Sequence, residues 1–264
     1  MREPPRVLVF AGTTEGREFC RRALGAGFLV TASVATEYGR EAAAEGIPAG
    51  DGRFSVLARR LRAEEMAELV AGFDAVVDAT HPYAAEVTRN IRGACGSRGV
   101  RLFRLRRRVE EPGGDCLTFG SMEDICAFIA REDGRLVGAG SPLPRVFVST
   151  GSKELLPFTR LADFSSRVSV RVIPSAEAIR ACEALGFPKR SIIAMQGPFS
   201  AALNEAMFRE RGSTVLVTKL SGRNGGFREK IVAAKRCGMC VLALRPPEEE
   251  GEAFGMNEIL SALG

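Results

Sequence analysis

The chain has 264 residues, 45% of them hydrophobic and 26% charged, which is the composition of a globular protein long enough for two domains. No stretch comes near the ~20 uninterrupted apolar residues of a membrane-spanning helix, so an integral membrane protein is excluded. The net charge of +5 suits an anionic partner, but the basic residues are dispersed and aromatic residues make up only 7%, so we expect a small anionic ligand and no nucleic acid.

Apolar runs that suit buried parallel strands alternate with amphipathic helical patterns along the chain. The expected strands lie near residues 6–10, 28–34, 74–79, 101–105, 145–149, 168–172, 191–196, 214–218 and 240–244. The expected helices lie near residues 15–25, 55–71, 84–98, 121–132, 176–185, 200–211 and 225–237. Strands that alternate with helices of this length predict an α/β fold built from βαβ units.

A segment rich in glycine and proline, residues 133–144, interrupts this alternation near the middle of the chain. We therefore expect two doubly wound, Rossmann-like parallel-sheet domains, residues 1–140 and 141–264, with a cleft between them. The tail of the second domain ends in a short apolar helical pattern at residues 257–263, which could dock back onto the rest of the protein.

The seven cysteines are scattered and odd in number, which indicates reduced thiols. Only Cys237 and Cys240 have C-x-x-C spacing, and His81 is the one histidine, so we expect no metal site. The amino-terminal segment lacks the apolar core of a secretory signal, which predicts a cytoplasmic protein.

The most informative segment is residues 7–17, where an apolar strand runs into a glycine-containing turn and then into a helical pattern. This order places backbone N–H groups and the positive end of a helix dipole at the carboxyl edge of a sheet, which suits a phosphate. The turn has two glycines, Gly12 and Gly16, where the usual dinucleotide fingerprint has three. These glycines could alternatively serve only a tight turn and close packing of the helix on the strand.

The end of the second strand bears on the kind of cofactor. Ser33, Thr36 and Arg40 could accommodate the 2′-phosphate of NADPH, whereas Glu37 could bind the 2′-hydroxyl of NADH. Either set could also merely cap a loop, so the sequence leaves NADPH and NADH open.

Polar residues also follow later strands, where open α/β sheets bind their ligands. His81, in a Thr-His-Pro turn, could be a general acid or could only bind the backbone of its turn. Lys219 could hold a carboxylate or donate a proton, or could be solvated and idle. There is no G-x-S-x-G elbow, which disfavours covalent hydrolysis and favours an oxidoreductase whose cofactor carries the hydride.

Taken together, these turns resemble the precorrin-6A reductase family of cobalamin biosynthesis, including its cobalt-precorrin-6A branch. The resemblance covers about residues 6–245, and the segments that carry it are residues 11–17, 33–36, 78–84, 149–155, 171–174, 195–200 and 217–219. It implies an oxidoreductase that transfers a hydride from NADPH or NADH to a double bond of a contracted, polycarboxylate tetrapyrrole, giving precorrin-6B or its cobalt form.

The resemblance also implies roles for the residues at the strand ends. In the first domain, the cofactor-binding residues would be Gly12, Thr13, Thr14, Glu15, Gly16, Arg17, Ser33, Thr36, Thr80 and Pro82. In the second domain, the substrate-binding residues would be Ser149, Thr150, Gly151, Lys153, Gly197, Pro198, Phe199, Ser200 and Ser221. His81 and Lys219 would be catalytic. Leu220 departs from the acidic or amide residue common in the family, which puts a polar role there in doubt.

Two alternatives remain at this point, a non-enzymatic sensor of nucleotides or tetrapyrroles and another NAD(P)H-dependent small-molecule reductase. A short-chain-type reductase usually needs a Tyr-x-x-x-Lys pair, and neither Tyr38 nor Tyr83 has a lysine four residues later. The sequence leaves monomer and homodimer open.

Overall fold

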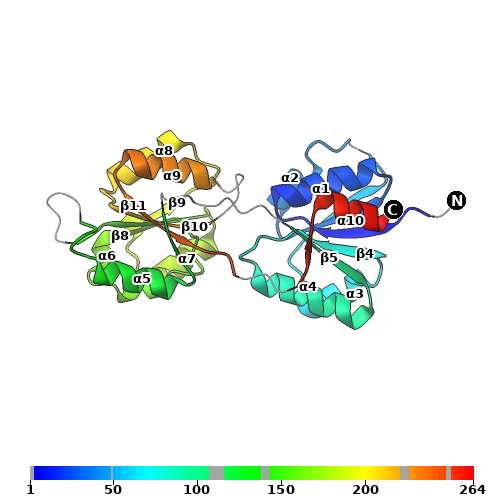
Figure 1. Ribbon diagram of the computed structural model, residues 1–264, viewed down its shortest axis with the longest axis horizontal. Coiled ribbons are helices and arrows are strands. Elements are labelled where there is room, and N and C mark those ends of the chain that lie inside the picture. Colours follow the sequence, from blue (N-terminus) through cyan, green and yellow to red (C-terminus); the bar gives the residue numbers. More distant parts are fainter. Residues whose placement is uncertain (1–2, 49, 107–115, 138–142, 221–225, 248–250) are drawn as a thin grey trace. The chain divides into compact units, whose positions relative to one another are not determined.

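The computed structural model describes residues 3–48, 50–106, 116–137, 143–220, 226–247 and 251–264. The chain forms two compact units, one made of Met1–Arg107 and Pro247–Gly264 and the other of Arg108–Pro246. Each unit contains one six-stranded sheet in which all neighbouring strands are parallel (Figure 1).

The first unit has the strand arrangement of a dinucleotide-binding domain. Its strands are β1 (Arg6–Phe10), β2 (Leu29–Val34), β3 (Phe54–Ala58), β4 (Ala75–Asp78), β5 (Arg101–Leu105) and β12 (Ala253–Phe254). Its helices are α1 (Thr14–Gly25), α2 (Glu37–Ala44), α3 (Ala63–Val70), α4 (Ala85–Arg98) and α10 (Met256–Leu263). The spatial order β3-β2-β1-β4-β5-β12 is the doubly wound order 3-2-1-4-5-6, with the sixth strand supplied by the carboxyl-terminal segment.

Strand β1 is buried on both faces, because its side chains alternate between two apolar layers. Val7 packs in the cluster that contains Phe19 of α1 and Ile259 of α10, and Leu8 and Phe10 pack against α3 and α4. Figure 1 shows α1, α2 and α10 on one face of this sheet and α3 and α4 on the other. With both faces covered, the carboxyl edge of the sheet is the place left for a ligand.

The second unit repeats this arrangement. Its strands are β6 (Leu117–Phe119), β7 (Val146–Val148), β8 (Val168–Val172), β9 (Ile192–Ala194), β10 (Val215–Lys219) and β11 (Cys240–Leu244). Its helices are α5 (Met122–Arg131), α6 (Phe164–Arg167), α7 (Ala176–Ala184), α8 (Ala201–Glu210) and α9 (Phe227–Arg236), with short 3-10 helices η2 (Leu156–Arg160) and η3 (Lys189–Ser191). The spatial order is β9-β8-β7-β10-β11-β6, so here the outermost strand comes from the start of the unit.

The two doubly wound α/β sheets are as expected, but the division of the chain differs from the boundary near residue 140. Strand β6 pairs with β11, so residues 117–119 belong to the second sheet, and the second unit begins before the expected boundary. Strand β12 pairs with β5, and Ile259 of α10 is fully buried in the core of the first unit. The predicted docking of the tail is therefore confirmed, although it docks on the first unit.

One local prediction is wrong. Residues 55–71, expected as a single helix, instead form the end of β3 and, after a turn, α3. Phe54 and Val56 of the edge strand β3 pack against the core of the first unit. Because β3 is short, its alternating apolar residues resemble the start of the helical pattern that follows. All seven cysteines are free thiols, and no helix in the described part of the chain is long and apolar enough to cross a membrane.

Candidate active site

The strand order of the first sheet reverses between β1 and β4, and at such a switch point the loops leave a crevice at the carboxyl edge. Thr13 joins the two loops that meet there. Its hydroxyl donates to the carbonyl of Ala79 at 2.8 Å and accepts from the N–H of Gly16 at 3.2 Å, so it caps α1 while tying the β1–α1 turn to the end of β4.

The two glycines of this turn have different structural roles. A Cβ on Gly16 would lie 2.9 Å from the Cα of Ala11 and 3.0 Å from the Cβ of Ala79, so α1 can pack this closely only with glycine there. A Cβ on Gly12 would meet no protein atom within 4 Å, and Gly12 is exposed. Gly12 thus borders open space just before the first turn of α1, whose N–H groups have no helical carbonyl to bind. Free N–H groups at a helix N-terminus are the donors that commonly bind anions in proteins.

The rest of the turn supplies charge of both signs. Thr14, Glu15 and Arg17 are half-buried in the first turn of α1, and Arg17 donates to the hydroxyl of Thr14 at 2.9 Å. This hydrogen bond holds the guanidinium beside the helix N-terminus, where it would add to the attraction for an anion.

The end of β2 holds the residues expected to bear on cofactor type. Ser33 is buried, and Thr36 caps α2 by accepting from the N–H of Gly39 at 3.1 Å. Glu37 and Arg40, both exposed, form an ion pair with 2.5 Å between Oε1 and Nε. Glu37 and Arg40, the acidic and basic candidates for recognising the 2′ position of the adenosine ribose, are therefore paired with each other.

A buried ion pair holds the end of β4. Asp78 and Arg104 lie opposite each other on β4 and β5, are 1% and 5% exposed, and approach to 2.9 Å. Thr80 donates to the same Asp78 oxygen from its hydroxyl (2.7 Å) and its N–H (2.9 Å). In the part of the chain that the structure describes, the other oxygen, Oδ2, has no hydrogen-bond partner. The side chain of Thr80, expected to contact the cofactor, thus holds the turn that presents His81.

His81 is exposed at this edge, and half-buried Pro82 follows it. The N–H of Tyr83 donates to Nδ1 of His81 at 3.4 Å, and the two rings lie 5.4 Å apart. Nδ1 is turned toward the N–H of Tyr83, so Nε2 is the ring nitrogen left to face a ligand.

The second sheet has its own switch point, between β7 and β10. Ser149, Thr150 and Gly151 follow β7, and Ser149 donates to the carbonyl of Val217 on β10 from its N–H at 2.9 Å. Gly151 has a φ of +92°, which favours glycine, and the hydroxyl of Thr150 is buried with no partner among the described residues. Lys153 is exposed in the same loop.

Lys219 ends β10 and forms an ion pair of 2.6 Å with Glu154 of the loop after β7. The pair bridges the two sides of the switch point. Leu220, at the position where the resemblance put a polar role in doubt, is buried in the core beside Phe227 of α9, which explains the apolar residue there. Ser221 lies outside the described residues.

The turn from β9 to α8 contains the remaining expected residues. Ser200 caps α8 by accepting from the N–H of Leu203 at 3.2 Å, and Gly197 and Pro198 precede Phe199 in the turn. The ring of Phe199 lies 4.1 Å from the guanidinium of Arg171 on β8. The turn from β9 to α8 therefore lies beside the end of β8. The loops at residues 149–154 and 219–220 lie together at the switch point of the second sheet.

Two buried cations in the second unit, Arg171 and Lys230, were not expected from the sequence. Burial lowers the pKa of Arg171 to about 10, and burial together with the charge of Arg171 lowers the pKa of Lys230 to about 8. A signal was present: Arg171 lies between two valines of a buried strand, and Lys230 lies three residues after Phe227 on the buried face of α9.

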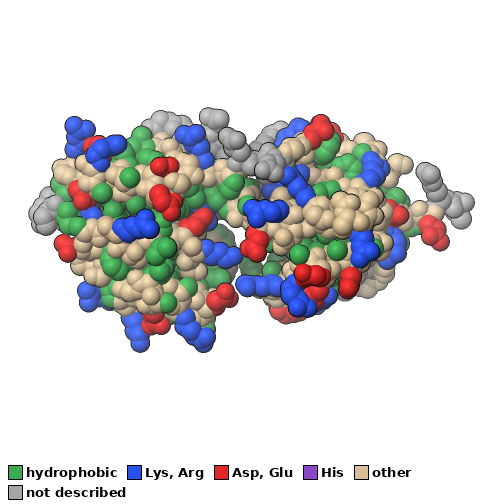
Figure 2. Space-filling model, turned by 90° about the horizontal axis from the view of Figure 1, so that it is seen from below, with side chains coloured by type: hydrophobic (Ala, Val, Ile, Leu, Met, Phe, Trp, Pro, Cys, Tyr) green, Lys and Arg blue, Asp and Glu red, His purple; other side chains and the backbone are tan. Residues whose placement is uncertain are grey.

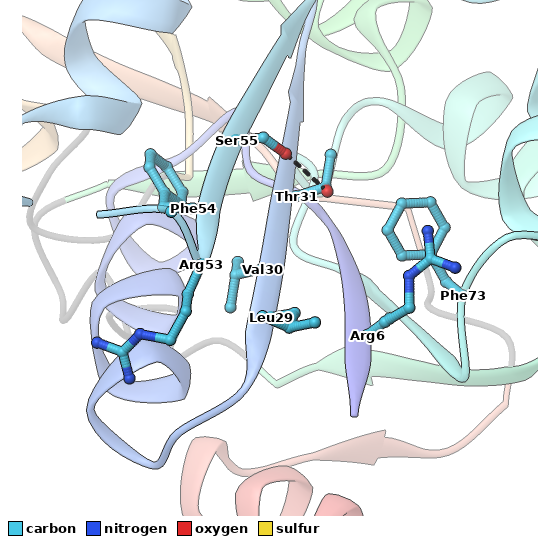
Figure 3. Close-up of a pocket in the computed structure, with 9 residues that line it drawn as sticks. Arg6, Leu29, Val30, Thr31, Arg53, Phe54, Ser55 and Phe73 are labelled. Carbon is cyan, nitrogen blue, oxygen red and sulfur yellow. Dashed lines mark hydrogen bonds between the residues drawn. The ribbon is translucent and has the colours of Figure 1, made fainter. Parts of the chain in front are cut away.

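The pocket in Figure 3 lies at the other edge of the first sheet. It is formed where β1, β2 and β3 begin, with Arg6 stacked on Phe73 and the hydroxyls of Thr31 and Ser55 hydrogen-bonded at 2.9 Å. It is therefore separate from the turn between β1 and α1. Figure 2 shows basic side chains interspersed with acidic ones on the visible face of each unit. Among the residues that the structure describes, no group of His, Cys, Asp and Glu could hold a metal ion.

The family model for precorrin-6x reductase CbiJ/CobK matches residues 6–263. The chain is 33% identical over 263 residues to the cobalt-precorrin-6A reductase of Priestia megaterium, with 97% of each chain covered. It is 36% identical over 249 residues to the cobalt-precorrin-6A reductase of Salmonella typhimurium, covering 91% of this chain and 87% of the relative. This chain belongs to the precorrin-6x reductase family. The solved structure of CobK precorrin-6A reductase, 20% identical, covers 98% of this chain and 96% of its own with a TM-score of 0.67, so the family fold extends over both units.

Proposed function

We propose that this protein is a reductase that adds a hydride and a proton across a double bond of precorrin-6A or its cobalt form. The observation that carries the proposal is membership of the precorrin-6x reductase family over residues 6–263. The names of the two relatives above favour the cobalt form. When bound, NADPH or NADH supplies the hydride and leaves as the oxidised cofactor.

In this proposal the first unit binds the cofactor. The N–H groups that follow Gly12, together with Arg17, hold the diphosphate, and Ser33 and Thr36 lie near the adenosine ribose. The open space at Gly12 and the N-terminus of α1 support this assignment. The turn that contains Thr80, His81 and Pro82 faces the nicotinamide.

The second unit binds the tetrapyrrole through the loop at residues 149–153 and the turn at residues 197–200. Lys219, held by Glu154, is the second candidate catalytic residue, placed to steady a carboxylate of the substrate.

In this proposal the imidazolium form of His81 gives up the proton from Nε2 that completes the reduction, and the ring is left neutral. We expect His81→Gln to lower kcat by about 100-fold while leaving the KM for the cofactor within about twofold, because only proton transfer loses its donor. Tyr83→Phe, which keeps the ring beside the imidazole, is the matched control. A kcat of His81→Gln close to that of the unchanged protein would assign the proton to water instead.

The Glu37–Arg40 pair sets the preference between NADPH and NADH. Removing the carboxylate with Glu37→Gln should raise the ratio of kcat/KM for NADPH over NADH by about tenfold, and removing the guanidinium with Arg40→Gln should lower it by a similar factor. Opposite shifts are expected because one charge repels and the other attracts a 2′-phosphate. Equal ratios in both variants and the unchanged protein would remove this pair from cofactor recognition.

The test of the proposed function is an anaerobic reaction of the purified protein with NADPH or NADH and each form of precorrin-6A. Loss of nicotinamide absorbance together with a shifted pigment spectrum is expected. Binding of both ligands without consumption would contradict a reductase and support a sensor instead.

A further inference from the structure

Arg171 and Lys230 are two cations that the protein buries without a carboxylate. They are 6% and 9% exposed, and neither has an ion pair among the residues that the structure describes. Lys230 donates to the hydroxyl of Thr218 at 3.2 Å, and Arg171 donates to the side-chain oxygen of Asn204 at 2.7 Å. Both partners are neutral. Buried charges of like sign are costly unless a counter-charge compensates them. Glu229, the residue before Lys230 in α9, acts on Lys230 electrostatically but forms no ion pair with it among the described residues.

The register of the sheet places these groups in one row at its carboxyl edge. Val148 pairs with Val170 and with Val217, so the next residues along, Arg171, Ser149 and Thr218, follow side by side on β8, β7 and β10. Side chains alternate along a strand, so this row points to the face where Phe147 packs against helices α8 and α9. Asn204 on α8 and Lys230 on α9 contact this row from the helical layer, Asn204 at Arg171 and Lys230 at Thr218.

The donors of this row are not all used within the protein. A guanidinium has five N–H donors and an ammonium has three, yet the described contacts to oxygen are one for Arg171 and one for Lys230. Nε and Nη2 of Arg171 have no hydrogen-bond partner among the described residues and are not among the fully enclosed atoms, so these donors are within reach of solvent. Phe199 covers one face of the guanidinium, at 4.1 Å, which fixes its plane.

We propose that Arg171 and Lys230 form a carboxylate-binding site that takes a peripheral carboxylate of the tetrapyrrole. This inference rests on the proposed function for the identity of the ligand. The carboxylate would accept hydrogen bonds from the free donors and add a negative charge beside the two cations.

Apolar side chains beside the row suit the body of the same ligand. Ile173 follows β8 and Met195 follows β9, with the register Val172–Ala194 just before them, so the two lie next to each other at the edge. They are 59% and 38% exposed. An apolar surface next to buried cations fits a ligand with an apolar ring and anionic substituents better than it fits a free inorganic anion.

Direct titration of tetrapyrrole binding, followed by pigment absorbance without cofactor, tests the site independently of turnover. Arg171→Met and Lys230→Met should each raise the dissociation constant at least about tenfold, because each removes a buried partner of the carboxylate. Arg180→Met, which removes an exposed cation of α7, is the matched control and should stay within about twofold. The dissociation constant for NADPH should be unchanged in all three variants.

Charge-preserving variants separate binding from folding. Arg171→Lys and Lys230→Arg should recover part of the lost affinity, whereas a merely structural role would not follow charge. If both methionine variants fold, by circular dichroism, and bind the tetrapyrrole as the unchanged protein does, the inference is wrong. If the unchanged protein binds the tetrapyrrole but oxidises no NAD(P)H, the proposed function is wrong. The carboxylate-binding site is then still tested by the titrations of the variants, which need no turnover.

The pH dependence of that titration gives a second readout. The charged groups that act on Lys230 are Arg171 from β8 and Glu229 from its own helix, and the net effect of burial and of these charges is a pKa of about 8. Lys230 is therefore charged below this pH and neutral above it, so affinity for the tetrapyrrole should fall as the pH rises from about 7 to about 9. In Lys230→Arg the charge persists over this range, and the affinity should be nearly flat. Equal pH dependence in both proteins would contradict the role of Lys230.

Discussion

Replacing Gly12 with leucine is expected to weaken the binding of NADPH and NADH by at least about 100-fold without lowering the thermal stability of the protein. A Cβ at this position would lie in open space, and the backbone of Gly12 is not in the left-handed region, so we expect the fold to accept leucine. The same side chain would occupy the space assigned to the diphosphate, and the hydrogen bonds from the first turn of α1 would be lost. Fluorescence titration and thermal unfolding measure the two effects.

Gly16→Ala is the matched control for this prediction, because it places a smaller side chain in the same turn. Its Cβ would lie 2.9 Å from the backbone of Ala11, so α1 must shift and the thermal stability should fall. Unchanged cofactor affinity in Gly12→Leu would remove the β1–α1 turn from cofactor binding.

Arg104→Met is expected to lower the free energy of unfolding of the first unit by about 3–5 kcal/mol. Its guanidinium is the buried counter-charge of Asp78, whose carboxylate is 1% exposed and has one oxygen without a hydrogen-bond partner in the described residues. Methionine fills a similar volume but leaves that carboxylate uncompensated. Urea denaturation followed by circular dichroism measures the change.

Arg106→Met provides the control, since it removes an exposed ion pair from the end of the same strand. Arg106 lies 3.7 Å from Glu258 and also donates to the carbonyl of Ala253. Its side chain is 57% exposed, so the loss should be about 1 kcal/mol, well below that of Arg104→Met. In the double variant Arg104→Met, Asp78→Asn, part of the stability should return because the unpaired charge is gone. Equal losses for Arg104→Met and Arg106→Met would mean that the buried pair does not hold the end of β4.

The sequence predicts the strands inside the sheets best, because burial leaves apolar side chains there, near-continuous in β1 and β11 and interrupted by arginine in β5 and β8. β1, β5, β8 and β11 have the expected bounds, and the turn after β1 lies at the switch point. The edge strands are harder to predict. β6 and β12 are three and two residues long, and they join their sheets through pairings between residues far apart in the chain. These pairings set the boundary of the two units, but they produce no pattern in the neighbouring sequence from which the boundary could be predicted.

The polar residues of the site also fall into those that the sequence predicts and those that it does not. Gly12, Thr13 and His81 follow strands, so strand ends alone nominate them. The network of Asp78 and Arg104, and the row of Arg171 and Lys230, depend on which strands and helices are neighbours, and a linear sequence does not contain that information. The sequence also does not predict that the hydroxyl of Thr80 donates a hydrogen bond to Asp78, because this contact depends on the geometry of one turn.

The most direct test of the proposed reduction is transfer of a label from cofactor to pigment. Cofactor that carries deuterium at its hydride position should deliver one deuterium to the tetrapyrrole for each cofactor oxidised, detected by mass spectrometry of the product under anaerobic conditions. The label should be retained when the reaction is run in ordinary water. A reduced tetrapyrrole without deuterium, or oxidation of the cofactor with no change in the tetrapyrrole, would contradict hydride transfer from the nicotinamide.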